Sequence, residues 1–433
     1  MIEKIFKLKK FGTDIKTEIR AGVTTFLTMA YIVIVNPAIL EGAGIPRGPS
    51  FVATIFTVVI GTLIMAFHAN RPFAIAPLMG ENAFVSFTVC KVMGYSWQTA
   101  LAGIFISGSL ITILTITKLR SWLINSIPLN LKYALAVGIG LFLAFIGFNE
   151  SGIVKVGTSG VPVQLGKFNS PSVLLSIFGL MVTLILIVRK THGAILIGIL
   201  ITTLVGFITR IVPLPKNIIS LPPSIKPIFL KLDFSSVFSI NFLPILLTMF
   251  LMDFLDMMGT LIGCSIKAGF VDEKGNLPEI EKPMLADSSA SIFSAILGTT
   301  TAGTYIESVA GIQEGGKTGL TAFVVSILFF LCLFFSPFLT AVPPSAYGPA
   351  LIVVGFLMVE PMTKIDFKDY TEFIPSFVVI SLMSFTYNIA VGLIAGFVIY
   401  PLLKIFSGRG KEVSIGLWVL FILSLIFFVF YHY

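Results

Sequence analysis

The chain is dominated by apolar runs of roughly 20 residues, which recur along almost its whole length of 433 residues. A helix of about 20 apolar residues crosses the hydrocarbon core of a bilayer. Hydrophobic residues make up 56% and charged residues 12% of the sequence, whereas soluble proteins carry about 25% charged residues. This pattern indicates an all-α polytopic membrane protein with the lipid bilayer as its environment. The longest polar interruptions, 210–241 and 267–283, are too short to form a domain.

Fourteen membrane segments are predicted from the apolar runs, and each boundary carries an uncertainty of a few residues. They cover residues 19–41, 49–68, 77–91, 97–118, 130–149, 171–188, 193–209, 241–266, 284–297, 306–314, 318–338, 346–359, 372–386 and 387–405. A fifteenth apolar run, 414–432, closes the chain.

Basic residues predict the orientation of these segments. With residues 1–18 inside and sides alternating through fourteen crossings, most of the 29 lysine and arginine residues fall on the inside, as cytoplasmic loops require. We therefore expect a cytoplasmic amino terminus and a location in the cytoplasmic membrane. The net charge of +8 follows from this topology, because the basic residues are dispersed among loops, and nucleic-acid binding is not expected.

Two of the predicted segments, 77–91 and 306–314, are too short to span and follow the irregular stretches NRPFAIAP and GTTTAGTY. Irregular backbone at membrane depth is tolerated only where protein buries it or where it lines a cavity. Interrupted segments at matching places in two halves point to a transporter binding site. The halves also share short matches, such as LTM at 27–29 and 247–249, and seven crossings per half would invert the second half.

Intramembrane acids are candidate functional groups because a charge at the bilayer centre costs at least about 2.5–3.5 kcal/mol. Asp253 and Asp256 share one helical face by their i, i+3 spacing, and Thr260 extends that face by a turn. Alternatively, one of these acids only ties helices together. Glu307 begins the short tenth segment, where a helix amino terminus favours a carboxylate or a ligand; its alternative role is a simple cap.

The facing element FAIAPLMGENAF places Glu81 and Asn82 where its short helix begins. Glu81 could also serve only as a cap or as the partner of a cation. Along the other irregular stretch, hydroxyl groups are offered by Thr299, Thr300, Thr301 and Thr304.

Four ordered stretches now carry a resemblance over essentially the whole chain. AGVTTFLTMAYIVIVNP (21–37), APLMGENAF (76–84), DFLDMMGTLIG (253–263) and GTTTAGTYIESVAGIQEGGKTGLTA (298–322) resemble signatures of the AzgA-like purine (hypoxanthine, guanine and adenine) permeases. These form a branch of the nucleobase–cation symporter-2, or nucleobase–ascorbate transporter, family. The chain departs from the usual D-x-F-D-T-x-G-T pattern at Leu255 and Met257.

The resemblance implies two inverted seven-segment repeats with short antiparallel strands before half-helices three and ten. It divides the chain into a core domain (19–126 and 241–338) and a gate domain (127–210 and 339–406). The run 414–432 lies outside this scheme. It is either an extra terminal helix, or residues 372–405 form a single broken crossing.

The same resemblance implies the site. Asp256 and Glu307 would hydrogen-bond the base, with Tyr305 and Thr260 beside them. Asn82 and Ala76 complete the predicted base-binding set, and Asp253, Glu81 and Thr25 are secondary candidates. No catalytic residue, cofactor or metal site is expected.

These residue types suit a neutral purine, because carboxylates accept from its N–H groups while free backbone N–H groups meet its acceptors. Burial disfavours the charged form of a carboxylate, so Asp256 or Glu307 could take up a proton outside and release it inside. We expect import of purine bases by proton symport with alternating access, a proton being favoured over Na⁺. A homodimer is compatible with the sequence, which does not determine the oligomeric state.

Three other classes are less compatible with the sequence. An anion (sulfate-type) transporter or exchanger of the same fold would need cationic groups, whereas two midplane acids would repel its substrate. A membrane enzyme would need a catalytic constellation, and none is visible. A pore would need rings of like residues from symmetric subunits, which are not visible either.

Overall fold

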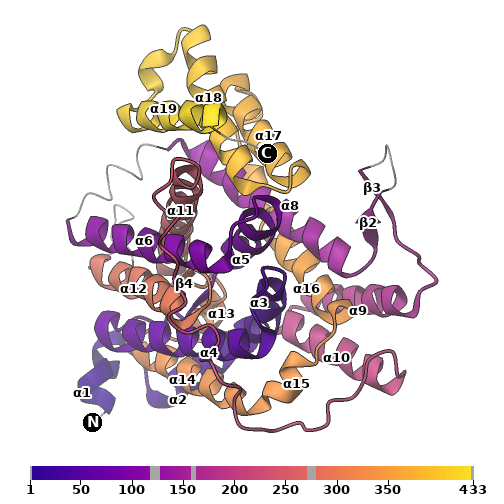
Figure 1. Ribbon diagram of the computed structural model, residues 1–433. Helices are drawn as coiled ribbons and strands as arrows, with labels where there is room; N and C mark the ends of the chain where they lie inside the picture. Colours follow the sequence, from indigo (N-terminus) through magenta and orange to yellow (C-terminus); the bar gives the residue numbers. More distant parts are fainter. Residues whose placement is uncertain (1, 118–126, 158–161, 271–278, 431–433) are drawn as a thin grey trace.

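A computed structural model describes residues 2–117, 127–157, 162–270 and 279–430, and Figure 1 shows it as a bundle of helices with a few short strands. The end of the first predicted core part (118–126) and the last residues of the run 414–432 lie outside the described residues.

The first half of the chain contains both interrupted and continuous helices. Its elements are α1 (Ile2–Phe6), η1 (Leu8–Phe11), α2 (Ile15–Met29), α3 (Ile32–Glu41), α4 (Arg47–Ile64), η2 (Met65–Ala69), β1 (Ile75–Pro77), α5 (Met79–Ala83), η3 (Phe84–Val92), α6 (Trp97–Ile116), α8 (Leu129–Glu150), β2 (Val154–Val156), β3 (Val163–Leu165), α9 (Pro171–Val188) and α10 (Ala194–Ile208). The β2–β3 hairpin was not predicted from the apolar pattern.

The second half likewise contains interrupted and continuous helices. It contains α11 (Leu243–Lys267), α12 (Glu281–Leu297), β4 (Ala302–Thr304), α13 (Ser308–Gln313), α14 (Gly319–Cys332), η4 (Leu333–Phe335), α15 (Ser336–Thr340), α16 (Pro344–Leu357), η5 (Glu360–Lys364), α17 (Tyr370–Phe385), α18 (Ile389–Phe406), η6 (Gly410–Glu412) and α19 (Ile415–Phe430).

The predicted all-α, multi-spanning fold is confirmed. In the described part of the chain, nine helical stretches are long and apolar enough to cross a membrane, and three shorter apolar helices accompany them. Residues 372–405 form two helices, α17 and α18, that pack against each other, and α19 packs on α18. The final apolar run therefore forms an additional helix, and residues 372–405 do not form a single broken crossing.

The two irregular stretches meet in the interior as the predicted antiparallel strands. β1 pairs with β4 in the register Ile75–Thr304, Ala76–Gly303 and Pro77–Ala302. The Thr62 hydroxyl on α4 bonds both the N–H and the C=O of Ile75, at 3.0 and 3.2 Å. This pairing brings the starts of α5 and α13 together, although they come from opposite halves of the chain.

The threonine-rich stretch stays buried because neighbouring helices satisfy its polar groups. The Asn36 amide on α3 donates to the Thr299 hydroxyl at 2.9 Å, and the Thr300 hydroxyl donates to the Asn82 side chain. Gly298, with φ of +93°, ends α12 in the left-handed conformation that favours glycine. A stretch that is polar in sequence is thus a satisfied interior element.

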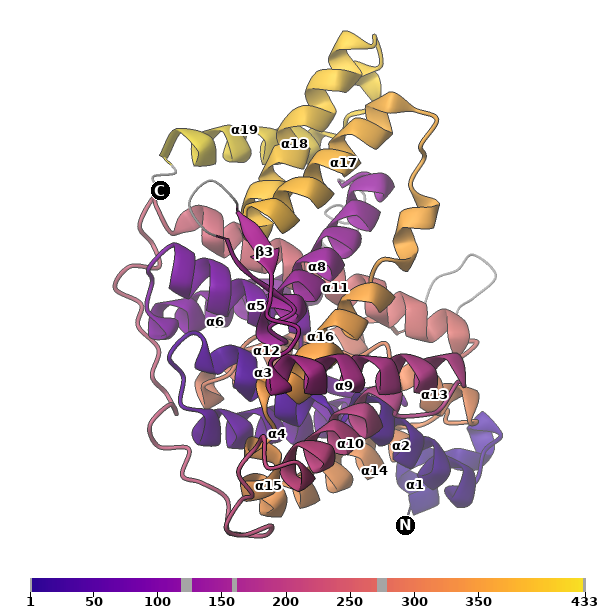
Figure 2. The ribbon, with the colours of Figure 1, turned by 90° about the vertical axis from the view of Figure 1, so that its right-hand side faces the viewer.

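The helices pack in two groups. One group contains α2, α4, α6, α12 and α14, which contact one another and the strands; the other contains α8, α9, α10, α16, α17 and α18. In Figure 1 the first group lies to the left and α9, α10 and α16 lie to the right, with α17 to α19 at the top. Figure 2 shows α9 and α10 lying side by side in the second group.

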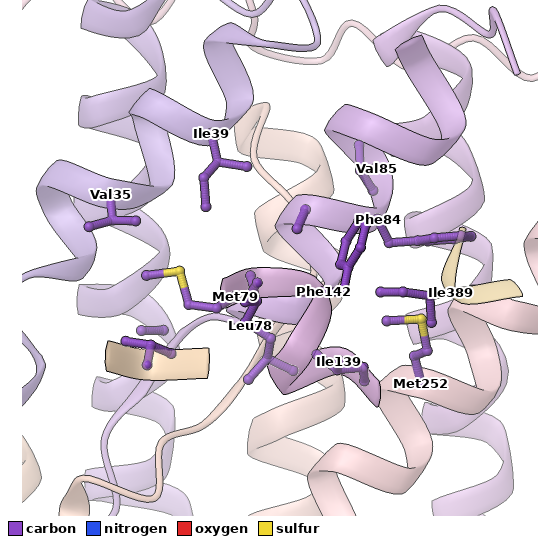
Figure 3. Packing of buried hydrophobic residues seen from close by; sticks show 14 of the residues in the cluster. Val35, Ile39, Leu78, Met79, Phe84, Val85, Ile139, Phe142, Met252 and Ile389 are labelled. Atoms are coloured by element: carbon purple, nitrogen blue, oxygen red, sulfur yellow. The ribbon is translucent and has the colours of Figure 1, made fainter. Parts of the chain in front are cut away.

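Apolar side chains fill the interface between these groups and also face outwards. Figure 3 shows Leu78 and Met79 from the start of α5 near Ile139 of α8 and Met252 of α11. On the outer surface, the side chains of Val188, Ile208 and Phe385 are 80–86% exposed. Such exposed apolar surface is stable only against lipid or another apolar partner.

Candidate functional site

A cavity of about 380 Å³ lies beside the ends of the two strands. Its volume is within the range of small-molecule sites, roughly 300–1,000 Å³. It is bordered by both helix groups and by the starts of α5 and α13.

The two sides of this cavity differ in chemistry. The side formed by α2, α5, α11, β4 and α13 carries the acids and most of the hydroxyl groups, namely Thr28, Tyr31, Glu81, Asp256, Thr260, Thr304, Tyr305 and Glu307. The opposite side is mostly apolar and is formed by Ile139, Ile187, Ala194, Ile195, Val354, Leu357 and Met358, with Thr191 as its hydroxyl group. A flat ligand would therefore be held by hydrogen bonds on one side and by apolar contact on the other.

Glu307 stands at the amino terminus of α13 and is oriented by a tyrosine. The buried Tyr31 hydroxyl, between α2 and α3, donates to Glu307 Oε1 at 2.7 Å. The Thr28 hydroxyl donates mainly to the carbonyl oxygen of Thr25 at 2.8 Å and lies 3.4 Å from the main-chain oxygen of Glu307. With Oε1 occupied, Oε2 is available to accept from a ligand.

Asp256 and Thr260 lie one turn apart on α11, and both border the cavity. The Thr260 hydroxyl donates to the main-chain oxygen of Asp256 at 2.8 Å. Because the hydroxyl proton of Thr260 is used in this hydrogen bond, the Thr260 oxygen can act towards a ligand only as an acceptor. The Asp256 carboxylate is half-buried and can accept from N–H donors.

Tyr305 is held rigidly at the end of β4. Its N–H donates to the carbonyl oxygen of Ala74 at 2.9 Å, and its hydroxyl donates to the carbonyl oxygen of Pro77 at 2.5 Å. The ring therefore bridges both strands at the edge of the cavity. Met79 and Gly80, the first residues of α5, border the same cavity, and their N–H groups lack a carbonyl partner one turn earlier in the helix.

The structure brings some predicted residues to the cavity and places others behind it. Asp256, Glu307, Thr260, Tyr305 and the secondary candidate Glu81 border it. Four predicted residues are buried and do not line it within the described part of the chain: Ala76, Asn82, Thr25 and Asp253.

These four residues support the site from behind. Ala76 pairs with Gly303 across the strands, and Asn82 accepts a hydrogen bond from Thr300. Thr25 packs against α13 at Gly311, whereas Asp253 faces the interior between α11 and α12. Whether any of them contacts a ligand stays a prediction.

Sequence reasoning missed Tyr31 and Thr28 as lining residues and Asp287 as a support, whereas Thr304, one of the four threonines singled out in the irregular stretch, does line the cavity. Asp287 Oδ2 accepts from both the N–H and the hydroxyl of Thr304, each at 2.7 Å. As an acid within an apolar segment, Asp287 carried the same signal as Asp253. No sequence pattern indicated that Tyr31 would reach Glu307, because that contact depends on how α2, which Tyr31 closely follows, packs against α13.

The charge of the site limits what it can hold. Its described lining contains three acids, Glu81, Asp256 and Glu307, and no lysine, arginine or histidine. Such a lining accepts hydrogen bonds from a neutral or cationic ligand and repels an anion.

A family model described as a permease family matches residues 16–395. The chain belongs to this permease family. A permease of Methanocaldococcus jannaschii is 47% identical over 98% of this chain and 97% of its own. The guanine/hypoxanthine permease PbuG of Bacillus subtilis is 40% identical over 99% of this chain and 100% of its own. The adenine permease AdeP of Escherichia coli is 39% identical over 99% and 96%. The resemblance to AzgA-like purine permeases is thereby confirmed.

Among solved structures, the permease resembles the transmembrane domain of a cyanobacterial bicarbonate transporter, BicA. The TM-score is 0.63 at 15% sequence identity, over 88% of this chain and 97% of that domain. The TM-score shows a common fold, and the low sequence identity says nothing about the substrate. The protein is a multi-pass membrane protein of the permease family.

Proposed function

We propose that this permease imports purine nucleobases across the cytoplasmic membrane, with its amino terminus on the cytoplasmic side. The acidic cavity carries the proposal, because it offers acceptors to the N–H groups of a neutral base and no cation to an anion. Relatives that cover the whole chain are named as adenine and guanine/hypoxanthine permeases. The anion-transporter alternative has the fold in its favour and the charge of the cavity against it.

In the proposed complex, the base lies between the polar and apolar sides of the cavity. Asp256 and Glu307 Oε2 accept from ring or exocyclic N–H groups. The amides of Met79 and Gly80 donate to ring nitrogens or a carbonyl oxygen. Ile139 and Val354 contact the base from the apolar side.

Transport then requires the two sides to move relative to each other. We propose that residues 19–126 and 241–338 form a core domain and that residues 127–210 and 339–406 form a gate domain. The packing of α8, α9, α10 and α16 against one another supports a separate gate. Apolar contacts, unlike hydrogen bonds, have no fixed direction, so the gate could slide past a base that the core holds. Alternating access of this kind is common when a site lies between two bundles.

A proton is the proposed coupling ion. Asp256 and Glu307 border the cavity, so either could exchange a proton with water when the cavity opens. Variants D256N and E307Q that kept the wild-type pH dependence of accumulation would exclude both residues as coupling groups.

The function is tested with purified protein in vesicles loaded with buffer. Uptake of labelled adenine, guanine and hypoxanthine is measured under an imposed pH gradient and, separately, under a Na⁺ gradient. We expect saturable purine uptake driven by a pH gradient that is acidic outside. Uptake of uracil or sulfate without any purine uptake would contradict the proposal.

A further inference from the structure

Two buried carboxylates next to the cavity have no hydrogen-bond partner. Glu81 on α5 is 4% exposed and Asp253 on α11 is 1% exposed. All four of their carboxylate oxygens are buried and make no regular hydrogen bond among the described residues; the nearest hydroxyl groups are those of Thr301 beside Glu81 and Ser291 beside Asp253. An unpaired, desolvated carboxylate costs several kcal/mol if it is ionised, which is why such groups take up a proton instead.

The charges that face this pair are all acidic. Glu81 interacts electrostatically with Asp253, Asp256 and Asp287, and Asp253 interacts with Asp256 and Asp287. Within the described residues, no cation is among the groups that act on either acid. Acids buried together without a cation are not all ionised at neutral pH, so this group of acids holds at least one proton.

The hydroxyl group next to Asp253 also favours a protonated acid. The Ser291 hydroxyl on α12 lies beside the Asp253 carboxyl, but it donates its proton to the carbonyl oxygen of Ala302 at 2.9 Å. Only a lone pair of Ser291 is therefore left for Asp253. A protonated Asp253 can donate to that lone pair, whereas an ionised Asp253 cannot be satisfied by it.

The proposed base contacts create a need for such a group. Protonation turns one acceptor oxygen of a carboxylate into a donor and makes the other a weaker acceptor, so a proton on Asp256 or Glu307 would weaken the proposed hold on the base. A separate holder would let the proton and the base bind at the same time. Glu81 borders the cavity, and Asp253 lies behind it.

We propose that Glu81 and Asp253 together hold the proton that crosses with the base. The proton enters from cavity water onto Glu81, is shared with Asp253, and returns to water when the cavity opens inside. This inference rests on the proposed proton-coupled uptake and moves the proton from the base-binding acids to a pair behind them.

The strand pair links this proton to the site. Asp287, which faces both acids, holds Thr304 through two hydrogen bonds, and Thr304 is followed by Tyr305 at the cavity. Loss of the proton would leave ionised Glu81 and Asp253 facing Asp287. Their repulsion would act on β4 and weaken the hold on the base.

A metal ion is a poorer occupant. Among the described residues, no group of three or more histidine, cysteine or acidic side chains has the arrangement of a metal site. A proton needs only two nearby oxygens. The experiment includes a Na⁺ arm because Na⁺ can also use hydroxyl and carbonyl oxygens.

The test compares E81Q, D253N and the double variant with the wild type in vesicles. Three quantities are measured: exchange of labelled purine for unlabelled purine without a gradient, accumulation under a pH gradient, and proton entry reported by a pH dye inside. We expect D253N, whose side chain lies behind the cavity, to keep exchange within about twofold of wild type. Accumulation and purine-dependent proton entry should fall by roughly tenfold or more in E81Q, D253N and the double variant, a usual size for coupling between sites. E360Q, which changes an exposed carboxylate on η5, is the matched control and should leave all three unchanged.

Each other outcome overturns a distinct statement. If E81Q and D253N still accumulate purine under a pH gradient to the wild-type level, the pair is not the proton holder. Accumulation driven by a Na⁺ gradient and lost in these variants would make the pair a sodium site. Purine exchange without any gradient-driven accumulation in wild type would refute proton coupling itself, and absence of purine exchange in wild type would refute the proposed function. If D253N does not fold, E81Q alone decides.

Discussion

Replacing Tyr31 by phenylalanine removes one hydroxyl group and keeps the ring, which makes it a sharp test of how Glu307 is oriented. The Tyr31 hydroxyl donates to Glu307 Oε1 at 2.7 Å, and the tyrosine is 1% exposed. In Y31F the Glu307 carboxylate loses this donor and is free to change its rotamer.

The size of the effect on binding follows from what differs between the free and the bound protein. The hydrogen bond is present in both states, so its whole energy does not enter the affinity. In Y31F, binding of the base must also order the mobile Glu307 side chain, which costs about 0.5–1.5 kcal/mol. Since about 1.4 kcal/mol is tenfold in a dissociation constant, purine binding should weaken roughly two- to twelvefold.

Stability should fall as well, because a hydrogen bond to a charged group contributes about 1.5–3 kcal/mol. Y347F is the matched control, since the Tyr347 hydroxyl donates to Glu150 Oε2 at 2.9 Å and this pair does not line the cavity within the described residues. Purine affinity is measured by calorimetry on detergent-purified protein, and stability by thermal unfolding of the same samples.

We expect both variants to lose stability and only Y31F to lose affinity. Unchanged purine affinity in a folded Y31F would refute the argument that Tyr31 orients a base-binding carboxylate. An equal loss of affinity in Y347F would show that the effect comes from general loosening of the bundle.

Three further predictions concern the frame of the site and the charged surface. Buried Glu18 accepts four hydrogen bonds from residues 317, 318 and 321 at the start of α14, so E18A should lower stability by about 3 kcal/mol, the cost of leaving buried donors unpaired. A Cβ atom at Gly311 would lie 2.1 Å from Thr25 Oγ1, so G311A should push α13 from α2 and lower transport about tenfold, an overpacking cost of about 1–3 kcal/mol. Hydrogen bonds from Arg409 and Lys404 lower the pKa of Glu412 to about 2. Their stabilising effect is therefore fully present above the ordinary pKa of about 4.3 and is lost as the pH falls towards 2. In R409Q the free energy of unfolding should change less between these two pH values than in wild type.

These three predictions have separate measurements. Thermal unfolding measures E18A, and a midpoint equal to wild type would contradict the role of Glu18. Purine uptake measures G311A against G48A, because a Cβ at Gly48 meets only ordinary contacts of 3.4 Å; equal uptake would contradict the steric argument. For R409Q, the free energy of unfolding is measured at pH values from 2 to about 6. A pH profile equal to that of wild type would show that the pKa of Glu412 does not depend on Arg409.

Local chemistry was enough to predict the membrane segments and the two interrupted helices. Apolar runs of helical length must form helices in lipid, because backbone groups there can be satisfied only within the segment. The irregular stretches before α5 and α13 had to be buried or line a cavity for the same reason. The acids Asp256 and Glu307 were found because intramembrane charge is costly, and the structure places both at the cavity.

Tertiary structure alone decided which polar groups meet. Three contacts join residues that are distant in sequence: the pairing of β1 with β4, the hydrogen bond from Tyr31 to Glu307, and the hydrogen bonds from Thr304 to Asp287. No local pattern encodes such contacts, since they depend on how separate helices and strands pack in three dimensions. The same packing put Asn82 and Ala76 behind the cavity and brought Glu81 beside Asp253. The sequence therefore determined that this protein has acids within apolar and interrupted helices, and only the fold decided that Glu81, Asp256 and Glu307 border the cavity while Asp253 and Asp287 lie behind it.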